Sequence, residues 1–154
     1  MRQSILANRT GPMQTAHFCS PAFLKQHPVN SPADLLRLPL FNMASRPGAW
    51  SHWFKSLEIA APVAAGMRFE QFSNVSQACI AGLGIALMPL FLISAEIESG
   101  QLVVAYQHTV KSPSSYYFVT PKARSSTPAV SAFRDWLLTE IKSESVTQPV
   151  TKPA

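Results

Sequence analysis

The sequence predicts an α/β fold in which helices cover a largely parallel sheet. Short apolar runs alternate with helical patterns along the chain, and the run at residues 85–88 is uniformly apolar. Three helices are predicted to start with a Ser or Thr followed by proline. Alternating strands and helices are typical of layered α/β folds, and a strand without polar positions is usually buried on both faces. The length of 154 residues suits one domain or part of one.

The predicted strands are apolar runs bounded by turn residues. Residues 4–8 and 13–19 flank a predicted turn at Gly11 and Pro12, because a glycine followed by a proline is a common turn signal. The later predicted strands are residues 40–43, 67–71, 85–88, 102–106 and 115–120.

The predicted helices are recognised by their starts and their apolar faces. Ser20, Ser31 and Thr127 each precede a proline, which supplies a hydroxyl N-cap and then a ring with helical φ. Ser73 or Asn74 is expected to cap another helix, and residues 89–100 form a further one. Two apolar faces follow the helical period: Trp50, Trp53, Phe54 and Leu57 in residues 49–57, and Val130, Phe133, Leu137 and Ile141 in the last helix.

Charge, cysteines and hydropathy exclude several classes of protein. The net charge of +5 is dispersed, so the sequence does not predict a DNA-binding surface. Cys19 and Cys79 stand far apart in apolar contexts, which favours buried free thiols over a disulfide or a zinc site. No signal peptide and no apolar run of roughly 18 residues is present, so we expect a cytoplasmic protein without membrane contact.

The sequence does not predict an enzyme, a metal site or a cofactor. His17 and Cys19 share a strand face, but the other histidines are scattered and no nucleophile motif frames either residue. The Gly82–Gly84 turn follows a helix and precedes a strand, which is the wrong order for a phosphate loop. Gly82 is therefore expected to end a helix in a left-handed conformation.

Two predicted strand-to-helix junctions are candidates for ligand binding. Ser73 and Asn74 follow one strand, where free amides and a hydroxyl would attract an anion at the carboxyl end of the sheet. Ser45 and Arg46 follow the strand that ends at Met43, and a guanidinium there can bind a carboxylate with two hydrogen bonds. For each junction the alternative is a cap that serves only its own helix.

Several short motifs follow one another in a distinctive order. They are LANRTGPM at residues 6–13, CSPAFL at 19–24, SPADL at 31–35, the Trp50/Trp53 pair, AGLGIALMP at 81–89, SGQLV at 99–103 and FRDWL at 133–137. Over about residues 5–141 this pattern resembles the C-terminal effector-binding domain of LysR-type transcriptional regulators.

The resemblance implies a periplasmic-binding-protein-like fold with two α/β lobes and an effector in the cleft between them. Residues 1–143 would be a partial domain of this kind, with a complete second lobe at about 28–102. Residues 5–24 and 103–141 would belong to an incomplete first lobe, and residues 144–154 are expected to form a disordered tail. A helix-turn-helix domain and the opening part of the first lobe are expected to lie outside this chain.

The resemblance also implies a function and a set of contacts. The chain would sense a small polar or anionic metabolite, reach DNA only through a helix-turn-helix domain absent from this chain, and form a homo-oligomer through the effector domain. The alternative is a lobe of a solute-binding transport protein, which would require an export signal. The expected effector contacts lie at strand ends of the second lobe: Ser45, Arg46, Phe72, Ser73, Asn74 and Gln77.

Overall fold

The chain folds into two compact units. The computed structural model describes the backbone of residues 5–60 and 66–146, and the side chains of residues 14–60, 66–111 and 117–141. The larger unit is Gln14–Ser112, and the smaller unit combines Met1–Met13 with Pro113–Ala154. The lobe boundaries expected from the sequence stay a prediction.

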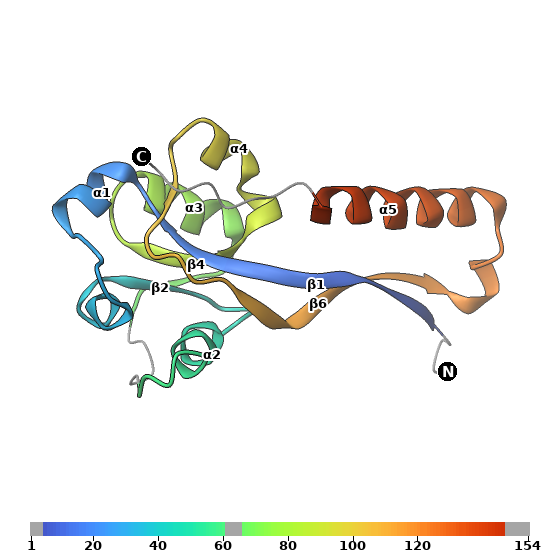
Figure 1. Cartoon of the computed structure of the whole chain (residues 1–154). Coiled ribbons are helices and arrows are strands. Elements are labelled where there is room, and N and C mark those ends of the chain that lie inside the picture. Colours follow the sequence, from blue (N-terminus) through green and yellow to red (C-terminus); the bar gives the residue numbers. More distant parts are fainter. Residues whose placement is uncertain (1–4, 61–65, 147–154) are drawn as a thin grey trace. The chain divides into compact units, whose positions relative to one another are not determined.

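The strands and helices alternate as predicted (Figure 1). The strands are β1 (Ile5–Cys19), β2 (Leu40–Met43), β3 (Arg68–Phe69), β4 (Ile85–Pro89), β5 (Val103–Val104) and β6 (Val110–Pro121). The helices are α1 (Pro21–Gln26), α2 (Ala49–Lys55), α3 (Phe72–Ile80), α4 (Ser94–Glu98) and α5 (Pro128–Val146). Short 3-10 helices are η1 (Pro32–Arg37), η2 (Leu90–Leu92) and η3 (Lys122–Arg124). None of the described helices is long and apolar enough to cross a membrane.

The sheet is mixed rather than largely parallel. Its strand order is β3-β2-β4-β1-β5, and β6 pairs with β1. β2 runs parallel to both β3 and β4, whereas β1 runs antiparallel to β4 and β5. The predicted α/β class is therefore confirmed, with parallel pairing confined to β2, β3 and β4.

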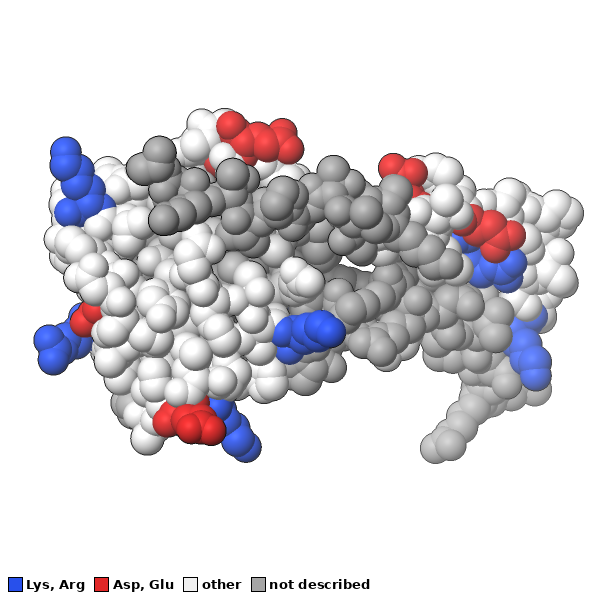
Figure 2. Space-filling model, viewed as in Figure 1, with Lys and Arg blue, Asp and Glu red and all other residues white. Residues whose placement is uncertain are grey.

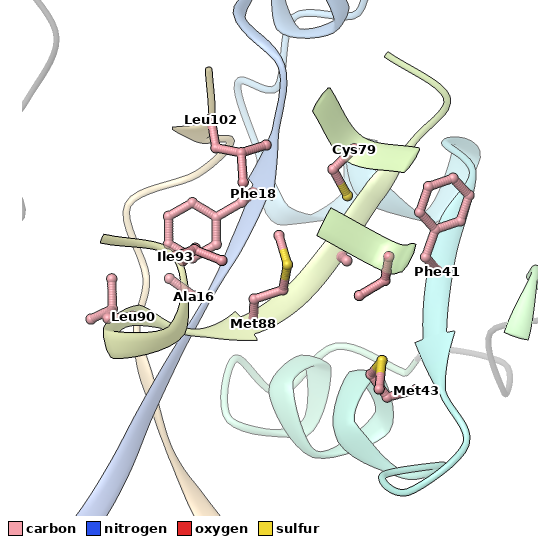
Figure 3. Packing of buried hydrophobic residues seen from close by; sticks show 11 residues of the cluster. Ala16, Phe18, Phe41, Met43, Cys79, Met88, Leu90, Ile93 and Leu102 are labelled. Carbon is pink, nitrogen blue, oxygen red and sulfur yellow. The ribbon is translucent and has the colours of Figure 1, made fainter. Parts of the chain in front are cut away.

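Residues of β1 and β4 alternate between two buried clusters, one on each face of the sheet. Ala16 and Phe18 of β1 pack with residues of α3 in the first cluster (Figure 3). Cys19 of β1 packs in the second cluster with Trp50 and Trp53 of α2. All five residues of β4 are buried, which confirms the prediction that this strand is covered on both faces. Cys19 and Cys79 are buried free thiols, also as predicted.

Several local signals produce the predicted conformation. The Ser20 hydroxyl accepts a hydrogen bond of 3.2 Å from the Phe23 amide at the start of α1. Asp34 accepts a 2.8 Å hydrogen bond from the Ser31 amide in a capping box, although the segment that follows is a 3-10 helix. Gly82 has a φ of 74° at the end of α3, a conformation that glycine adopts without steric penalty.

Other local predictions are wrong. Gly11 and Pro12 do not form a turn, because β1 continues through them. The φ of proline and the extended preference of the residue before it both suit a strand, and β6 provides a partner. The helix expected at residues 89–100 is divided into η2 and α4 by Ile93, which is fully buried with a non-helical φ of −132°.

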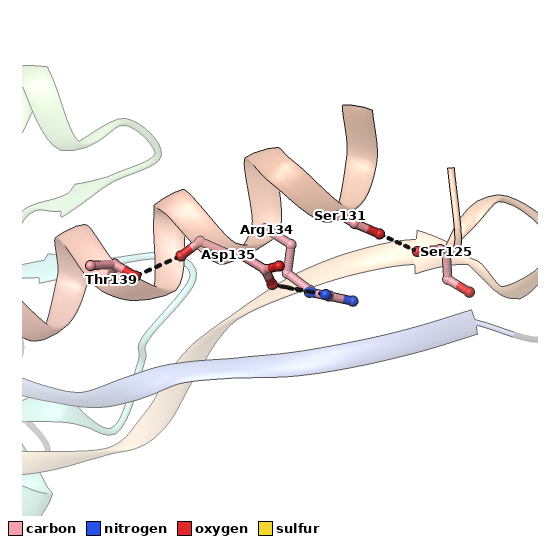
Figure 4. A network of polar contacts seen from close by, with 5 residues as sticks. All are labelled: Ser125, Ser131, Arg134, Asp135 and Thr139. Atoms are coloured by element: carbon pink, nitrogen blue, oxygen red, sulfur yellow. Dashed lines mark hydrogen bonds and ion pairs between the residues drawn. The ribbon is translucent and has the colours of Figure 1, made fainter. Parts of the chain in front are cut away.

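The smaller unit places α5 beside β6. The Phe118 ring of β6 lies 5.7 Å from the Phe133 ring, which lies 5.6 Å from Trp136. Arg134 forms a 2.8 Å ion pair with Asp135 on the helix surface (Figure 4). α5 continues to Val146, and the rest of the expected tail, residues 147–154, lies outside the described residues.

A Schellman motif ends α2 without the usual glycine. The Glu58 amide donates to Lys55 and the Ile59 amide donates to Phe54, both at 3.1 Å. Glu58 therefore adopts a φ of 58° while its side chain is exposed. A residue with a Cβ is strained in this conformation.

Glu58→Gly is expected to raise the free energy of unfolding by about 0.5 to 1 kcal/mol, because glycine relieves the left-handed strain. Urea denaturation monitored by circular dichroism measures the change. Glu58→Ala is the matched control, since it removes the charge but keeps the Cβ. An equal gain in the alanine variant would attribute the effect to charge and contradict the strain argument.

His17 is enclosed by aromatic rings. It has no exposed surface, and its ring centroid lies 4.6 Å from that of Trp53 and 6.3 Å from that of Tyr106. Within the described residues, neither imidazole nitrogen has a hydrogen-bond partner. Burial lowers the pKa of His17 from 6.5 to about 4, and His108 adds a smaller effect in the same direction. The ring is thus neutral near pH 7.

Acidification is therefore expected to destabilise the larger unit. Between about pH 6.5 and pH 4 the unfolded chain protonates His17 while the folded chain does not, so the free energy of unfolding falls by about 3 kcal/mol across this window. Urea denaturation at several pH values measures this slope. His17→Leu is expected to have a flatter profile than the parent, and indistinguishable slopes would show that His17 does not carry the effect.

Candidate functional site

The carboxyl ends of β2 and β3 lie side by side. Met43 is the register partner of Phe69, and the Ala44 amide donates a 2.8 Å hydrogen bond to the Phe69 carbonyl. Ser45 and Arg46 form the turn that follows β2, closed by a 2.9 Å hydrogen bond from the Arg46 amide to the Met43 carbonyl. α3 begins three residues after β3 ends. Both predicted junctions therefore lie at the same edge of the sheet.

The predicted caps of α3 are wrong. Gln71 is the N-cap, with an extended φ of −115° and ψ of 142°, and none of the described side chains caps the helix. An N-cap residue has non-helical dihedral angles, whereas Ser73 and Asn74 already lie inside the first turn. β3 ends two residues earlier than the sequence predicts, at Phe69, so the helix starts earlier as well.

The first turn of α3 has unpaired amides. Within the described residues, the N–H groups of Phe72, Ser73 and Asn74 have no hydrogen-bond acceptor. The first amides of a helix have no intrahelical partner, and the helix dipole adds partial positive charge there. This end of α3 can therefore bind an anionic or hydrogen-bond-accepting group.

The side chains expected at the site differ in their exposure. Ser45, Ser73, Asn74 and Gln77 are exposed, Arg46 is half-buried, and Phe72 is half-buried against the first buried cluster. Ser73 and Gln77 are four residues apart, which places them on the same face of α3. Ser45 and Arg46 lie at the sheet edge where α3 begins, because they follow β2 and β2 pairs in register with β3. Gln77 lies one helical turn beyond Ser73.

Ser76 is a residue that the sequence analysis missed. It is 4% exposed, and its hydroxyl has no hydrogen-bond partner within the described residues. A buried hydroxyl without a partner is costly and is commonly explained by a water or ligand. Side chains of a helix lean toward its N-terminus, here the end with unpaired amides. The sequence signal that could have identified Ser76 was its position on an otherwise apolar stripe of α3 with Val75 and Cys79.

Two histidines that are distant in sequence meet at Trp53. The Trp53 indole ring lies 4.6 Å from His17 and 5.6 Å from His108. Burial raises the pKa of Cys19 to about 12, so the nearby thiol stays protonated. Within the described residues, no three His, Cys, Asp or Glu side chains are placed to hold a metal ion.

Comparison with known proteins gives consistent results. A family model described as the LysR substrate binding domain matches residues 4–142. An uncharacterized HTH-type transcriptional regulator, y4mQ, of Sinorhizobium fredii is 33% identical over 117 residues, which are 74% of this chain and 39% of the relative. The glycine cleavage system transcriptional activator of Escherichia coli is 31% identical over 128 residues, which are 82% of this chain and 42% of the relative. The chain therefore spans about two-fifths of the length of these relatives.

Solved structures show the same fold. The effector domain of the transcriptional regulator AmpR of Pseudomonas aeruginosa is 25% identical with a TM-score of 0.81, over 94% of this chain and 68% of that one. The AmpR effector binding domain of Citrobacter freundii is also 25% identical, with a TM-score of 0.78, over 90% and 68%. The predicted periplasmic-binding-protein-like α/β class is confirmed. These relatives are transcriptional regulators rather than transport proteins, so the transport alternative is not supported.

The capping geometry predicts different effects of two serine substitutions. Ser20→Ala is expected to lower the free energy of unfolding by about 1 kcal/mol, because it removes the hydrogen bond to the Phe23 amide. Ser73→Ala is expected to stay within about 0.5 kcal/mol of the parent, because its exposed hydroxyl caps nothing. Urea denaturation of both variants tests this difference. A loss near 1 kcal/mol for Ser73→Ala would show that its side chain does cap α3.

Proposed function

The chain belongs to the LysR substrate-binding domain family, and we propose that it is the effector-sensing part of a bacterial transcription regulator. The effector is a small polar or anionic metabolite held at the carboxyl ends of β2 and β3. The single observation that best supports this location is the row of unpaired amides at Phe72, Ser73 and Asn74.

The amides and the neighbouring turn have complementary roles in this proposal. Unpaired helix amides give directional hydrogen bonds to a carboxylate or another acceptor group. Arg46, in the turn after β2, contributes positive charge to the same edge. Ser45 and Gln77 supply neutral hydrogen-bonding groups, and Phe72 supplies an apolar wall. The Ser76 hydroxyl adds a buried polar group one helical turn after Phe72.

Regulation of transcription requires more than this chain in our proposal. DNA is contacted through a separate helix-turn-helix domain, in a homo-oligomer that forms through the effector domain in the cytoplasm. On the face shown in Figure 2, neither unit has a broad patch of Lys and Arg side chains among its described residues. A dispersed basic surface does not favour direct binding of DNA by this part. The relatives are regulators, so we assign no enzymatic activity.

A metabolite titration tests the proposed site. Amino acids and small carboxylates are screened for compounds that raise the melting temperature of the chain, because a ligand that binds the folded state stabilises it. The best compound is then titrated into the ¹⁵N-labelled chain. We expect saturable amide shifts at Ser45, Arg46 and residues 72–77. Shifts confined to other residues, or no stabilising compound, would contradict the proposal.

Two substitutions of Ser73 distinguish the contribution of its amide to ligand affinity from that of its hydroxyl. Ser73→Pro removes an amide within the first helical turn, where proline is tolerated, while Ser73→Ala keeps it. We expect affinity to fall about tenfold in the proline variant and to change little in the alanine variant, since a hydrogen bond to a charged ligand contributes about 1.5 kcal/mol or more. Equal affinities, with both variants folded, would exclude the amide contact.

A further inference from the structure

A second concave site lies at the opposite edge of the sheet. A pocket of about 570 Å³ is formed by the start of α1, the end of α3 and the turn before β5; its walls include Ser20, Phe23, Gln26, Ile80, Ala81 and Gln101. α3 ends five residues before the amino end of β4, whereas Ser45 and Arg46 follow the carboxyl end of β2. Because β2 and β4 are parallel, these features lie at different edges.

We propose that this pocket binds a small uncharged molecule with an apolar body and a carboxamide-like group that both donates and accepts hydrogen bonds. Its volume lies within the range of about 300 to 1,000 Å³ typical of small-molecule sites. The site is distinct from the proposed effector site and goes beyond that function.

The Ser20 hydroxyl supplies a buried donor. Ser20 is 6% exposed and accepts a hydrogen bond from the Phe23 amide, but within the described residues its own proton has no acceptor. A Cβ at Gly82 would lie 3.4 Å from this oxygen, so the end of α3 closely approaches the hydroxyl. A serine hydroxyl can donate one hydrogen bond while it accepts others. A ligand acceptor would satisfy that donor.

The end of α3 supplies acceptors. Within the described residues, the carbonyl oxygens of Ile80 and Ala81 accept no hydrogen bond. The last carbonyls of a helix lack intrahelical partners and carry partial negative charge. The residues that line the pocket thus include one unpaired donor and unpaired acceptors, which together complement a primary carboxamide.

The walls also determine the expected ligand charge. Every described residue that lines the pocket is uncharged. Gln26 and Gln101 add neutral carboxamides, while Phe23 and Ile80 provide apolar surface. A charged ligand would lose hydration here without gaining a formally charged partner, and the partial charge of the α3 carbonyls does not replace one, so a neutral ligand is favoured.

A series of three similar probes tests this proposal on the full 154-residue chain. Benzamide, benzoate and benzylamine share one ring and differ in charge. Each is titrated into ¹⁵N-labelled protein at pH 7. We expect benzamide to cause saturable shifts at the amides of Phe23, Ala81 and Gln101, with at least fivefold higher affinity than either charged probe. Shifts confined to residues 72–77 would place the binding at the other edge of the sheet and overturn the proposal.

Matched substitutions locate the binding. Ala81→Phe places a large ring in the pocket wall and is expected to weaken benzamide binding at least tenfold. Ala95→Phe, at an exposed position of α4 outside the pocket, is expected to leave binding unchanged. Equal shifts for all three probes, absence of saturation, or undiminished binding by a folded Ala81→Phe variant would each overturn the proposal.

Discussion

Both buried clusters of the larger unit depend on the antiparallel pairing of β1 with β4. Phe18 pairs with Ala86 and His17 pairs with Leu87, so successive pairs face opposite sides of the sheet. A shift of one residue would exchange the faces and move His17 from its aromatic surroundings into the cluster beside α3. The correct register places tryptophans against one face and α3 against the other. This pairing therefore determines which helix packs on each face of the sheet, independently of any polar contact.

The position of both candidate sites follows from the same arrangement. β2 lies next to β4 and runs parallel to it, so strand ends that are distant in sequence meet at one edge. α3 crosses between the edges and leaves unpaired amides at its start and unpaired carbonyls at its end. Backbone groups that a helix cannot satisfy internally thus supply much of the polar character at each edge.

Local signals in the sequence predicted much of this structure, but not its details at the candidate site. The hydroxyl and ring of Ser20 and Pro21 define a helix start whatever the surroundings. The pairing of β3 with β2 determines where β3 ends. The end of β3 in turn determines the dihedral angles of Gln71, which make this residue the N-cap of α3. The unpaired state of Ser76 depends on the packing of a whole helix face, and its local signal is no more than a serine among the apolar residues of that face. The strand through Gly11 and Pro12 likewise requires β6, which is distant in sequence.

The Gln71 side chain does not cap α3, and this has an evolutionary consequence. Replacement of Gln71 by aspartate, asparagine or serine would satisfy one amide of the first turn and stabilise the helix. The same oxygen would then compete with any ligand for that amide. Selection for thermal robustness and selection for metabolite response therefore act in opposite directions at this residue. In a homologue adapted to high temperature, a capping residue at this position would stabilise α3 but would weaken the response to the metabolite.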